Sequence, residues 1–245
     1  MSIVNAQHGS TVDEIADGIY RISVPVPPAA FPGGFSFNQY LVADDKPLLF
    51  HTGPRKLFPL VSEAIARVLP VASLAYVAFS HVESDECGAL NDFLAAAPAA
   101  VPVCSQVAAN VSINDLADRP ARALADGEVL ALGRHRLRWI DAPHVPHGWE
   151  CGFAFEEVTR TLLCGDLFTQ PGHANPALTE GDILGPSEAF RGQMDYFAHA
   201  RDASRHFERI AATDPATLAC MHGSAWRGNG AMLLRELAAS VTRAG

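Results

Sequence analysis

The amino-acid sequence predicts a layered α/β fold in which helices cover the outer faces of two packed sheets. Short apolar segments separated by turn residues occur in two batches, and each batch is followed by segments with helical spacing. Hydrophobic residues make up 49% of the 245 residues, which is enough to form a substantial core. Because the chain has no repeat of fixed period and no convincing linker, residues 1–245 are expected to form a single domain.

The first batch begins with residues 18–24, where apolar and polar side chains alternate as in a half-buried strand. Residues 74–80 form a continuous apolar run, which is typical of a strand buried on both faces. Two other segments place apolar residues on one face of a helix. In chain order we expect strands at 18–24, 35–42, 47–50 and 74–80, with helices at 57–68 and 89–94.

The second batch consists of shorter strand candidates, including a hairpin around residues 156–159. One long helix is expected where Phe190, Phe197 and Phe207 recur, after a stretch rich in Gly and Pro. The expected strands are 101–107, 128–132, 136–141, 152–155, 161–164 and 217–221, and the expected helices are 190–210 and 232–241.

The composition restricts the classes of function. The net charge of −9 argues against binding to nucleic acid or to an anionic membrane, because both need a basic face. No apolar run approaches the roughly 20 residues of a membrane span, and no signal peptide is recognisable. The five cysteines are odd in number and include no Cys-x-x-Cys pair, so we expect reduced thiols and a cytoplasmic location.

Side chains that can bind metal recur just past the ends of predicted strands. They are His81, Glu83 and Asp85 after the first buried strand, His144 and His147 after residue 141, Asp166 after residue 164, and His222 after residue 221. Strand ends at one edge of a sandwich converge, and sites in such folds are built from the loops there. Imidazole combined with carboxylate suits iron, manganese or zinc.

The spacing within the first group also favours a metal site. In an extended or loosely turning loop alternate residues point the same way, so His81, Glu83 and Asp85 can face one cavity. Two metal ions close together need a bridging carboxylate, which a lone Asp on another strand can supply. Asp166 is the candidate for that bridge.

These residues resemble the metallo-β-lactamase superfamily, and within it the flavodiiron proteins and related single-domain oxygen-binding diiron proteins. Residues 81–86 (His-Val-Glu-Ser-Asp-Glu) are similar to the His-x-Glu-x-Asp-His motif of that branch. Further similar segments follow the same order along the chain, at residues 37–42, 86–90, 142–147, 164–168 and 221–223. The resemblance covers roughly residues 18–225 and implies an αββα sandwich that holds two metal ions, with iron preferred to zinc or manganese.

The resemblance also implies a ligand set. It is His81, Glu83 and His144 for one ion, Asp85 and His222 for the other, and Asp166 as the bridge. His147 is the alternative to His144: the motif alignment favours His144, whereas the separation from Asp166 fits His147 better. A hairpin longer by three residues would reconcile the motif with His144, which we therefore expect to be the ligand.

Two positions depart from the pattern of the family. Glu86 stands where the family has a His ligand for the second metal, and Glu can also bind iron or zinc. The site is then expected to have a more anionic shell or to hold a single ion. His51 replaces the Asp of an Asp-Thr-Gly turn that supports the ligands rather than binding metal itself.

Three functions are compatible with such a centre. The first is a non-haem diiron protein that binds or reduces dioxygen; the chain ends at Gly245 without a flavodoxin-like segment, so we expect an external electron donor. The second is a zinc or manganese hydrolase of an ester, lactam or thioester, in which Asp85 orients the hydroxide and His147 protonates the leaving group. The third is an oxygen or redox sensor with a signalling partner. The resemblance makes a homodimer plausible for all three.

Overall fold

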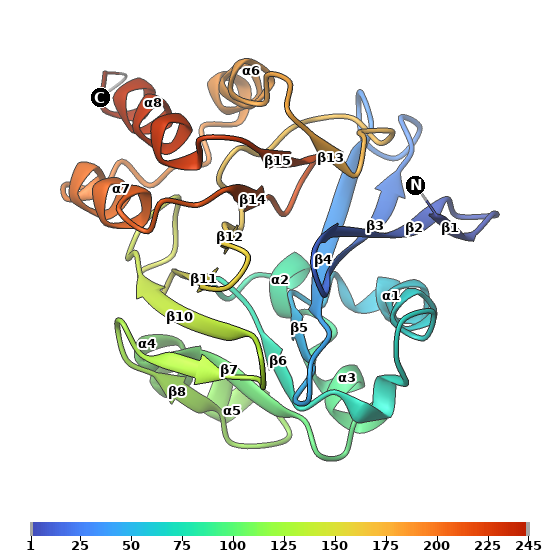
Figure 1. Ribbon diagram of the computed structural model, residues 1–245. Helices are drawn as coiled ribbons and strands as arrows, with labels where there is room; N and C mark the ends of the chain where they lie inside the picture. The colour runs from blue at the N-terminus through green and yellow to red at the C-terminus, as the bar shows by residue number, and fades with distance from the viewer. Residues whose placement is uncertain (1, 244–245) are drawn as a thin grey trace.

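The computed structural model describes residues 2–243 and contains two mixed sheets (Figure 1). In the first sheet the strands lie in chain order, antiparallel from β1 to β5 and parallel from β5 to β8. Its strands are β1 (Ser2–Asn5), β2 (Ser10–Ala16), β3 (Ile19–Val26), β4 (Phe35–Val42), β5 (Leu48–Phe50), β6 (Tyr76–Ala78), β7 (Val101–Ser105) and β8 (Arg122–Leu124).

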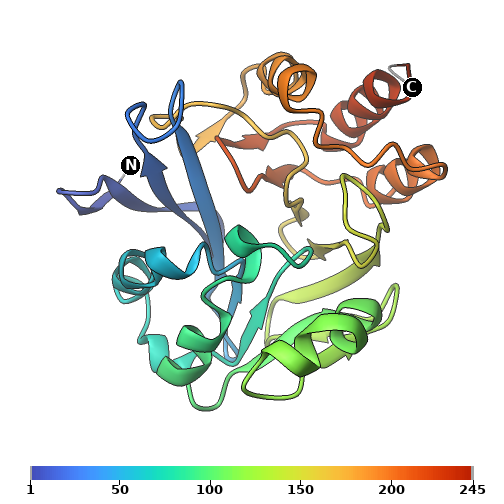
Figure 2. The ribbon, with the colours of Figure 1, turned by 180° about the vertical axis from the view of Figure 1, so that it is seen from behind.

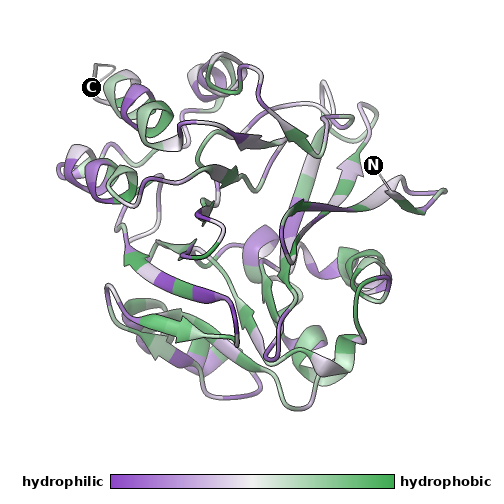
Figure 3. Ribbon diagram, in the orientation of Figure 1, coloured by the Kyte–Doolittle hydropathy of each residue, from purple (hydrophilic) through white to green (hydrophobic). Residues whose placement is uncertain are grey.

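The second sheet has the order β13-β15-β14-β12-β11-β10-β9. Its strands are β9 (Val129–Ala131), β10 (Arg136–Asp141), β11 (Gly152–Glu156), β12 (Thr161–Leu163), β13 (Leu178–Thr179), β14 (Thr217–Ala219) and β15 (Ala225–Arg227). Strands β12 and β14 are parallel neighbours, which brings their carboxyl ends to the same edge. In Figure 3 β10 alternates between hydrophilic and hydrophobic residues, as its exposed and buried positions require.

Helices cover the outer face of each sheet. The α-helices are α1 (Phe58–Ile65), α2 (Ser84–Cys87), α3 (Leu90–Ala96), α4 (Gln106–Ala108), α5 (Asn114–Leu116), α6 (Leu184–Met194), α7 (Ala203–Ala211) and α8 (Gly230–Arg243). Three further helical turns are η1 (Arg55–Leu57), η2 (Val71–Ser73) and η3 (Ala109–Ile113). Helices α1 and α3 lie on one side of the molecule and α7 and α8 on the other, in both ribbon views (Figures 1 and 2).

Three buried apolar clusters separate these layers. Phe50 and Trp139 belong to the cluster between the two sheets. Phe93 belongs to the cluster under α1 and α3, and Phe207 to the cluster under the helices that cover the second sheet. The predicted αββα sandwich is therefore confirmed. No helix of residues 2–243 combines the length and the apolar character that crossing a membrane would need.

One predicted element differs from the structure. The long helix expected at 190–210 is two helices, α6 and α7, which are separated by residues 195–202. Helix α6 ends at Asp195, whose backbone is left-handed (φ 46°), a conformation that a continuing right-handed helix excludes. Phe207 and Ile210 of α7 pack under the second sheet together with Phe197, which lies between the two helices, whereas Phe190 of α6 stacks on Phe35 and Met194 is exposed. The apolar spacing that suggested one helix therefore combines residues from separate segments.

Candidate metal centre

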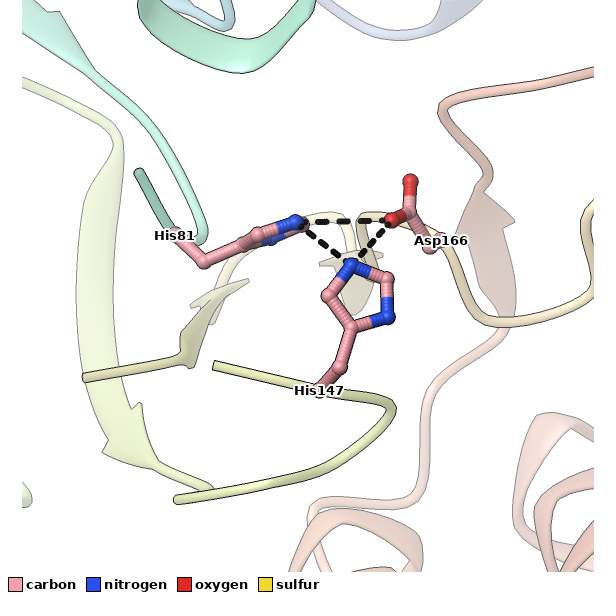
Figure 4. A group of neighbouring side chains, drawn as sticks. All are labelled: His81, His147 and Asp166. Atoms are coloured by element: carbon pink, nitrogen blue, oxygen red, sulfur yellow. Dashed lines mark hydrogen bonds and ion pairs between the residues drawn. The ribbon is translucent and has the colours of Figure 1, made fainter. Parts of the chain in front are cut away.

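The side chains predicted to bind metal gather at one edge of the sandwich, where several strands end. His81, Asp166 and His222 each follow a strand by three residues, since β6 ends at Ala78, β12 at Leu163 and β14 at Ala219. His147 comes from the longer loop after β10. Figure 4 shows His81, His147 and Asp166 pointing toward one another from three separate segments.

The first group of ligand atoms surrounds His81. Its Nε2 lies 3.0 Å from Nε2 of His147 and 3.5 Å from Oδ2 of Asp166. His147 Nε2 is 3.4 Å from the same Asp166 oxygen and 3.2 Å from Oε1 of Glu83. His81, His147 and Asp166 thus direct ligand atoms at one point, and Glu83 adds a further oxygen beside His81 and His147. Separations of 3–4 Å between such atoms are those of groups that can share a cation.

The second group surrounds His222. Its Nε2 lies 3.4 Å from Oδ2 of Asp85 and 3.3 Å from Oδ1 of Asp166. The two oxygens of Asp166 therefore face different groups: Oδ2 faces His81 and His147, and Oδ1 faces His222. This is the arrangement that a carboxylate bridging two metal ions requires.

The outer nitrogen of each histidine is held by the protein. His147 Nδ1 lies 2.8 Å from the carbonyl of Tyr196, and His222 Nδ1 lies 2.9 Å from the carbonyl of Ser36. A carbonyl only accepts, so both Nδ1 atoms carry a proton and both Nε2 atoms are the ones that face the centre. His81 Nδ1 is 3.0 Å from the hydroxyl of Ser80. Such outer contacts fix the orientation of metal-binding histidines.

A set of side chains from β3 and β4 fixes the loop that carries His222. Asn38 Nδ2 donates to the carbonyls of Cys220 and Gly223 at 2.9 and 2.8 Å, and the Tyr40 hydroxyl donates to the Cys220 carbonyl at 2.7 Å. The buried Arg21 adds a 2.7 Å bond to the Gly223 carbonyl. We call Arg21, Ser36, Asn38 and Tyr40 the β3–β4 clamp. Asn38 and Tyr40 lie in the strand motif noted in the sequence, whereas nothing in the sequence marked Arg21.

Glu150 connects the His147 loop to the segment that carries His81. Its Oε1 accepts a 3.0 Å hydrogen bond from the N–H of Val82, and its carbonyl accepts a 2.8 Å bond from the Ser105 hydroxyl. The side chain is buried, so this contact is shielded from water. Sequence reasoning missed Glu150, because a single Glu in a loop has no spacing signal.

The electrostatics of the cluster favour positive charge. Burial would lower the pKa of His222, but Asp166 and Asp85 raise it to about 10. Burial would raise the pKa of Asp166, yet hydrogen bonding to His222 and the charge of His81 hold it well below its usual value. In His147 the effect of burial is again outweighed, by Glu83 and Asp166, so its pKa is raised. A concave group of carboxylates with these effects is a typical cation site.

His144 is outside this cluster. It lies on the surface with a left-handed backbone (φ 63°), and its N–H donates to the Gly148 carbonyl at 2.8 Å. This turn points His144 away and returns the chain so that His147 enters the centre. The expectation that His144 belongs to the ligand group is thereby corrected. A second difference is that residues 84–87 form helix α2, so Asp85 and Glu86 project from a helical turn rather than from an extended loop.

Glu86 is buried completely beside the cluster. Its Oε1 lies 3.8 Å from His81 Nε2, and its carboxyl group forms a side-chain hydrogen bond with Asp85. Burial, reinforced by the charges of Asp166 and Asp85, raises the pKa of Glu86 well above its ordinary value. A carboxyl group buried in this way must be compensated by a proton or by a cation.

His51 lies behind His81 and supports it through a serine. Its Nε2 is 3.0 Å from the Ser80 hydroxyl, which also contacts His81. Burial lowers the pKa of His51 to about 3, so the imidazole is neutral. The position expected to support the ligands is therefore in contact with one of them through Ser80.

The residues present fit a pair of metal ions. The buried oxygens of Asp166 and Glu86 lie 3.3–3.8 Å from imidazole nitrogens of the cluster, a separation that suits groups arranged around a cation. The donors are imidazole nitrogens and carboxylate oxygens, with no thiolate, which suits iron better than a soft-metal site.

A cavity of about 610 Å³ opens next to the centre. Glu83 lies on its wall with a side chain that is 50% exposed, while it also contacts His147. Asp92, Asp118 and Arg55 line the same cavity. Carboxylates therefore outnumber cations on the wall of this cavity.

Comparison with known proteins identifies the family of the chain. The profile described as ODP family beta lactamase matches residues 35–223. "Putative diflavin flavoprotein A 1" of Thermosynechococcus vestitus is 28% identical over 199 residues, which are 79% of this chain and 34% of that protein. Rubredoxin-oxygen oxidoreductase of Megalodesulfovibrio gigas is 27% identical over 80% of this chain and 50% of its own length. Anaerobic nitric oxide reductase flavorubredoxin of Salmonella arizonae is 24% identical, over 80% and 42%.

The chain thus spans a third to a half of the length of these curated relatives. Among solved structures, the rubredoxin oxygen:oxidoreductase of Desulfovibrio gigas superposes with a TM-score of 0.79 at 20% identity, covering 95% of this chain and 61% of that one. The flavodiiron core of Synechocystis sp. superposes with a TM-score of 0.78 at 22% identity, covering 95% and 61%. These structures support the fold, and the profile match over most of the chain supports the family. The protein therefore belongs to the family described as ODP family beta lactamase, and its fold is that of the flavodiiron structures to which it is similar.

Proposed function

We propose that this chain is a non-haem diiron protein that binds and reduces dioxygen. The observation that carries the proposal is the division of the two Asp166 oxygens between two groups of ligands. The proposed ligands are His81, Glu83, His147 and Asp166 for one iron, and Asp85, His222 and Asp166 for the other, with Glu86 beside both. The family to which the chain belongs and the donor set, which contains no thiolate, support iron.

The names of the relatives support the substrate. One relative is called a rubredoxin-oxygen oxidoreductase and another a nitric oxide reductase. We extend the activity in the first of these names to the present chain: dioxygen is the electron acceptor, and a separate protein is the electron donor. The chain matches a third to a half of the length of these relatives, so a separate electron donor is proposed for it and is not taken over from them.

When bound, the two irons would supply the electrons and the sites for dioxygen. The chain holds the three histidines rigidly through Ser80, Tyr196 and Ser36, so their Nε2 atoms stay directed at the centre. Burial of Asp166 and His222 keeps bulk water away. Glu83 is half exposed and contacts His147, so it is the group through which protons from solvent reach the centre.

The first test is metal content followed by turnover. The protein, purified without added metal and then reconstituted anaerobically with Fe²⁺, is expected to hold two irons per chain and to consume oxygen when supplied with reduced rubredoxin. Stoichiometric zinc together with esterase activity would instead indicate a hydrolase. Two irons whose visible spectrum responds to oxygen, without steady consumption, would indicate a sensor.

A matched pair of variants tests the ligand assignment. His147→Asn removes an imidazole from the centre and is expected to lower bound iron from two to one or fewer per chain. His144→Asn changes the same loop at its surface, and Asn tolerates the left-handed backbone found there. It is expected to retain both irons. If His144→Asn loses iron and His147→Asn does not, the assignment is wrong.

A further inference from the structure

We propose that dioxygen enters through an apolar cavity between α6 and residues 27–34, the loop that joins β3 to β4, and that Phe35 separates this cavity from His222. We call the cavity, which Phe31, Phe190 and Met194 line, the aromatic cavity. This inference rests on the proposed function, since it names the route by which the substrate of that function arrives. It assigns a role to side chains that belong to neither group of ligands.

The first argument is the character of the aromatic cavity. Its volume is about 380 Å³, and Phe31 and Phe190 supply its aromatic walls. Among the described residues that line it, Gln193 is the only one with a polar side chain and none is charged. Apolar cavities stay dry and bind small apolar molecules, a class that includes dioxygen. The cavity beside Glu83 is different, because several charged side chains line it.

The second argument is a series of ring contacts that leads from the aromatic cavity to the metal centre. The centroid of the Phe35 ring lies 5.1 Å from that of Phe31 and 5.8 Å from that of Phe190, so Phe35 contacts both aromatic walls. The same Phe35 centroid lies 4.3 Å from the centroid of the His222 imidazole. A single side chain therefore separates the cavity from a proposed iron ligand.

The third argument is that the backbone fixes the loop beside α6. The N–H of Phe31 donates to the carbonyl of Pro27 at 3.2 Å, and the N–H of Gly34 donates to the carbonyl of Phe31 at 2.8 Å. The Gly34 carbonyl in turn accepts a 2.9 Å bond from the N–H of Gly172. Gly34 has a left-handed backbone (φ 78°), and a Cβ there would lie 2.5 Å from Nδ1 of His173, so this approach requires glycine. The wall that carries Phe31 is thus a fixed turn.

Phe35 itself can move. It is the first residue of β4, and its side chain is only half-buried. Side chains with an exposed edge change rotamer within nanoseconds, so rotation of Phe35 opens a passage often enough for a diatomic molecule. Dioxygen then reaches the centre on the His222 side, whereas Glu83, the proposed path for protons, contacts His147 in the other group.

The first test is xenon binding to the metal-free protein, because xenon is an uncharged atom that occupies apolar cavities and needs no iron. Met194 is 56% exposed at the mouth of the aromatic cavity, and Leu116 is 58% exposed on the wall of the cavity beside Glu83. Met194→Trp and Leu116→Trp are therefore matched variants that fill one cavity each. Xenon NMR, with circular dichroism to check folding, compares both variants with the wild type.

We expect xenon to bind between Phe31 and Phe190 in the wild type and in Leu116→Trp, and to lose this site in Met194→Trp. Absence of xenon from this site in the wild type would overturn the inference. So would a site that Met194→Trp leaves unchanged.

The second test is the rate at which dioxygen oxidises the reduced, iron-loaded protein in a stopped-flow instrument. No donor protein is present, so changes in donor binding cannot contribute. We expect Met194→Trp to lower the second-order rate constant about tenfold and Leu116→Trp to leave it unchanged, with two irons per chain in both. Phe35→Leu shortens the side chain between the cavity and His222, and it is expected to raise the rate constant about twofold.

An unchanged rate constant in Met194→Trp, or in a Phe35→Leu protein that holds two irons, would overturn the inference. An equal fall in Leu116→Trp would also overturn it, because dioxygen would then enter beside Glu83. Wild-type protein that binds no iron, or that binds iron but is not oxidised by dioxygen, would instead overturn the proposed function. The xenon measurement does not depend on that outcome.

Discussion

The two ends of the metal centre are held in different ways. The loop that carries His222 is bound by the β3–β4 clamp, so its backbone carbonyls and the outer nitrogen of the histidine have protein partners. On the other side, Glu86 is buried against other carboxylates and Glu83 is half exposed. One side is organised before metal binds, whereas the other side depends on the metal to compensate its charges.

The largest expected effect comes from the residue that joins the two sides. Asp166→Asn replaces one bridging oxygen by an amide group that donates hydrogen bonds and binds metal poorly. We expect loss of both irons, measured by metal analysis, with the fold retained by circular dichroism. If Asp166→Asn keeps two irons per chain, Asp166 is not the bridge and the two sides do not meet there.

The stability of the metal-free protein should depend on pH through the charge of His222, which lies on the organised side. The pKa of His222 is raised from 6.5 to about 10, because Asp166 and Asp85 outweigh its burial. A raised pKa contributes stability that is fully present below pH 6.5 and is lost as the pH rises toward 10. Denaturant unfolding is expected to show a loss of up to about 1.4 kcal/mol per pH unit in this window. In His222→Gln this part of the dependence should be absent; an identical pH profile would contradict the assignment.

Weakening the clamp should affect the fold as well as the metal. Asn38→Ala removes two buried hydrogen bonds to the His222 loop, and we expect a loss of about 2 kcal/mol in the free energy of unfolding of the metal-free protein. Tyr40→Phe removes one bond to the same loop and should cost about 1 kcal/mol. If the loop does not depend on the clamp, urea unfolding will show no loss in the free energy of unfolding for either variant.

The smallest effect is expected at the connection to the less organised side. Glu150→Ala removes the acceptor for the Val82 N–H, at an expected cost of about 1 kcal/mol. Because Val82 follows His81, the same variant should weaken iron binding roughly tenfold. Glu150→Gln retains an acceptor oxygen and is the matched control. Equal iron affinity in both variants would show that Glu150 does not position His81.

The sequence was sufficient to predict the layers and most of the side chains that the structure brings together at the candidate centre, because apolar strands that end in imidazole or carboxylate are a local pattern. His81, Asp166 and His222 all follow their strands by three residues, and the structure brings them together. His144 also follows β10 by three residues, yet His147 occupies the centre. The difference depends on the hydrogen bond from the His144 N–H to the Gly148 carbonyl, which closes the turn. The spacing of residues along the sequence does not indicate such a contact.

Other features depend on contacts between distant parts of the chain. The clamp joins β3 and β4 to residues 220–223, and Glu150 reaches Val82 across 68 positions. Individual polar residues of this kind carry no spacing signal, so the sequence cannot distinguish them from surface residues. The division of the expected long helix into α6 and α7 depends on one left-handed residue, Asp195, to which apolar spacing is insensitive.

The cavity beside Glu83 has a consequence for the kind of molecule that can occupy it. Glu83, Asp92 and Asp118 line it together with Arg55, which is paired with Asp92 at 3.3 Å, in a chain with a net charge of −9. Because the carboxylates outnumber the guanidinium, the cavity disfavours small anions, whereas an uncharged molecule is not excluded by charge.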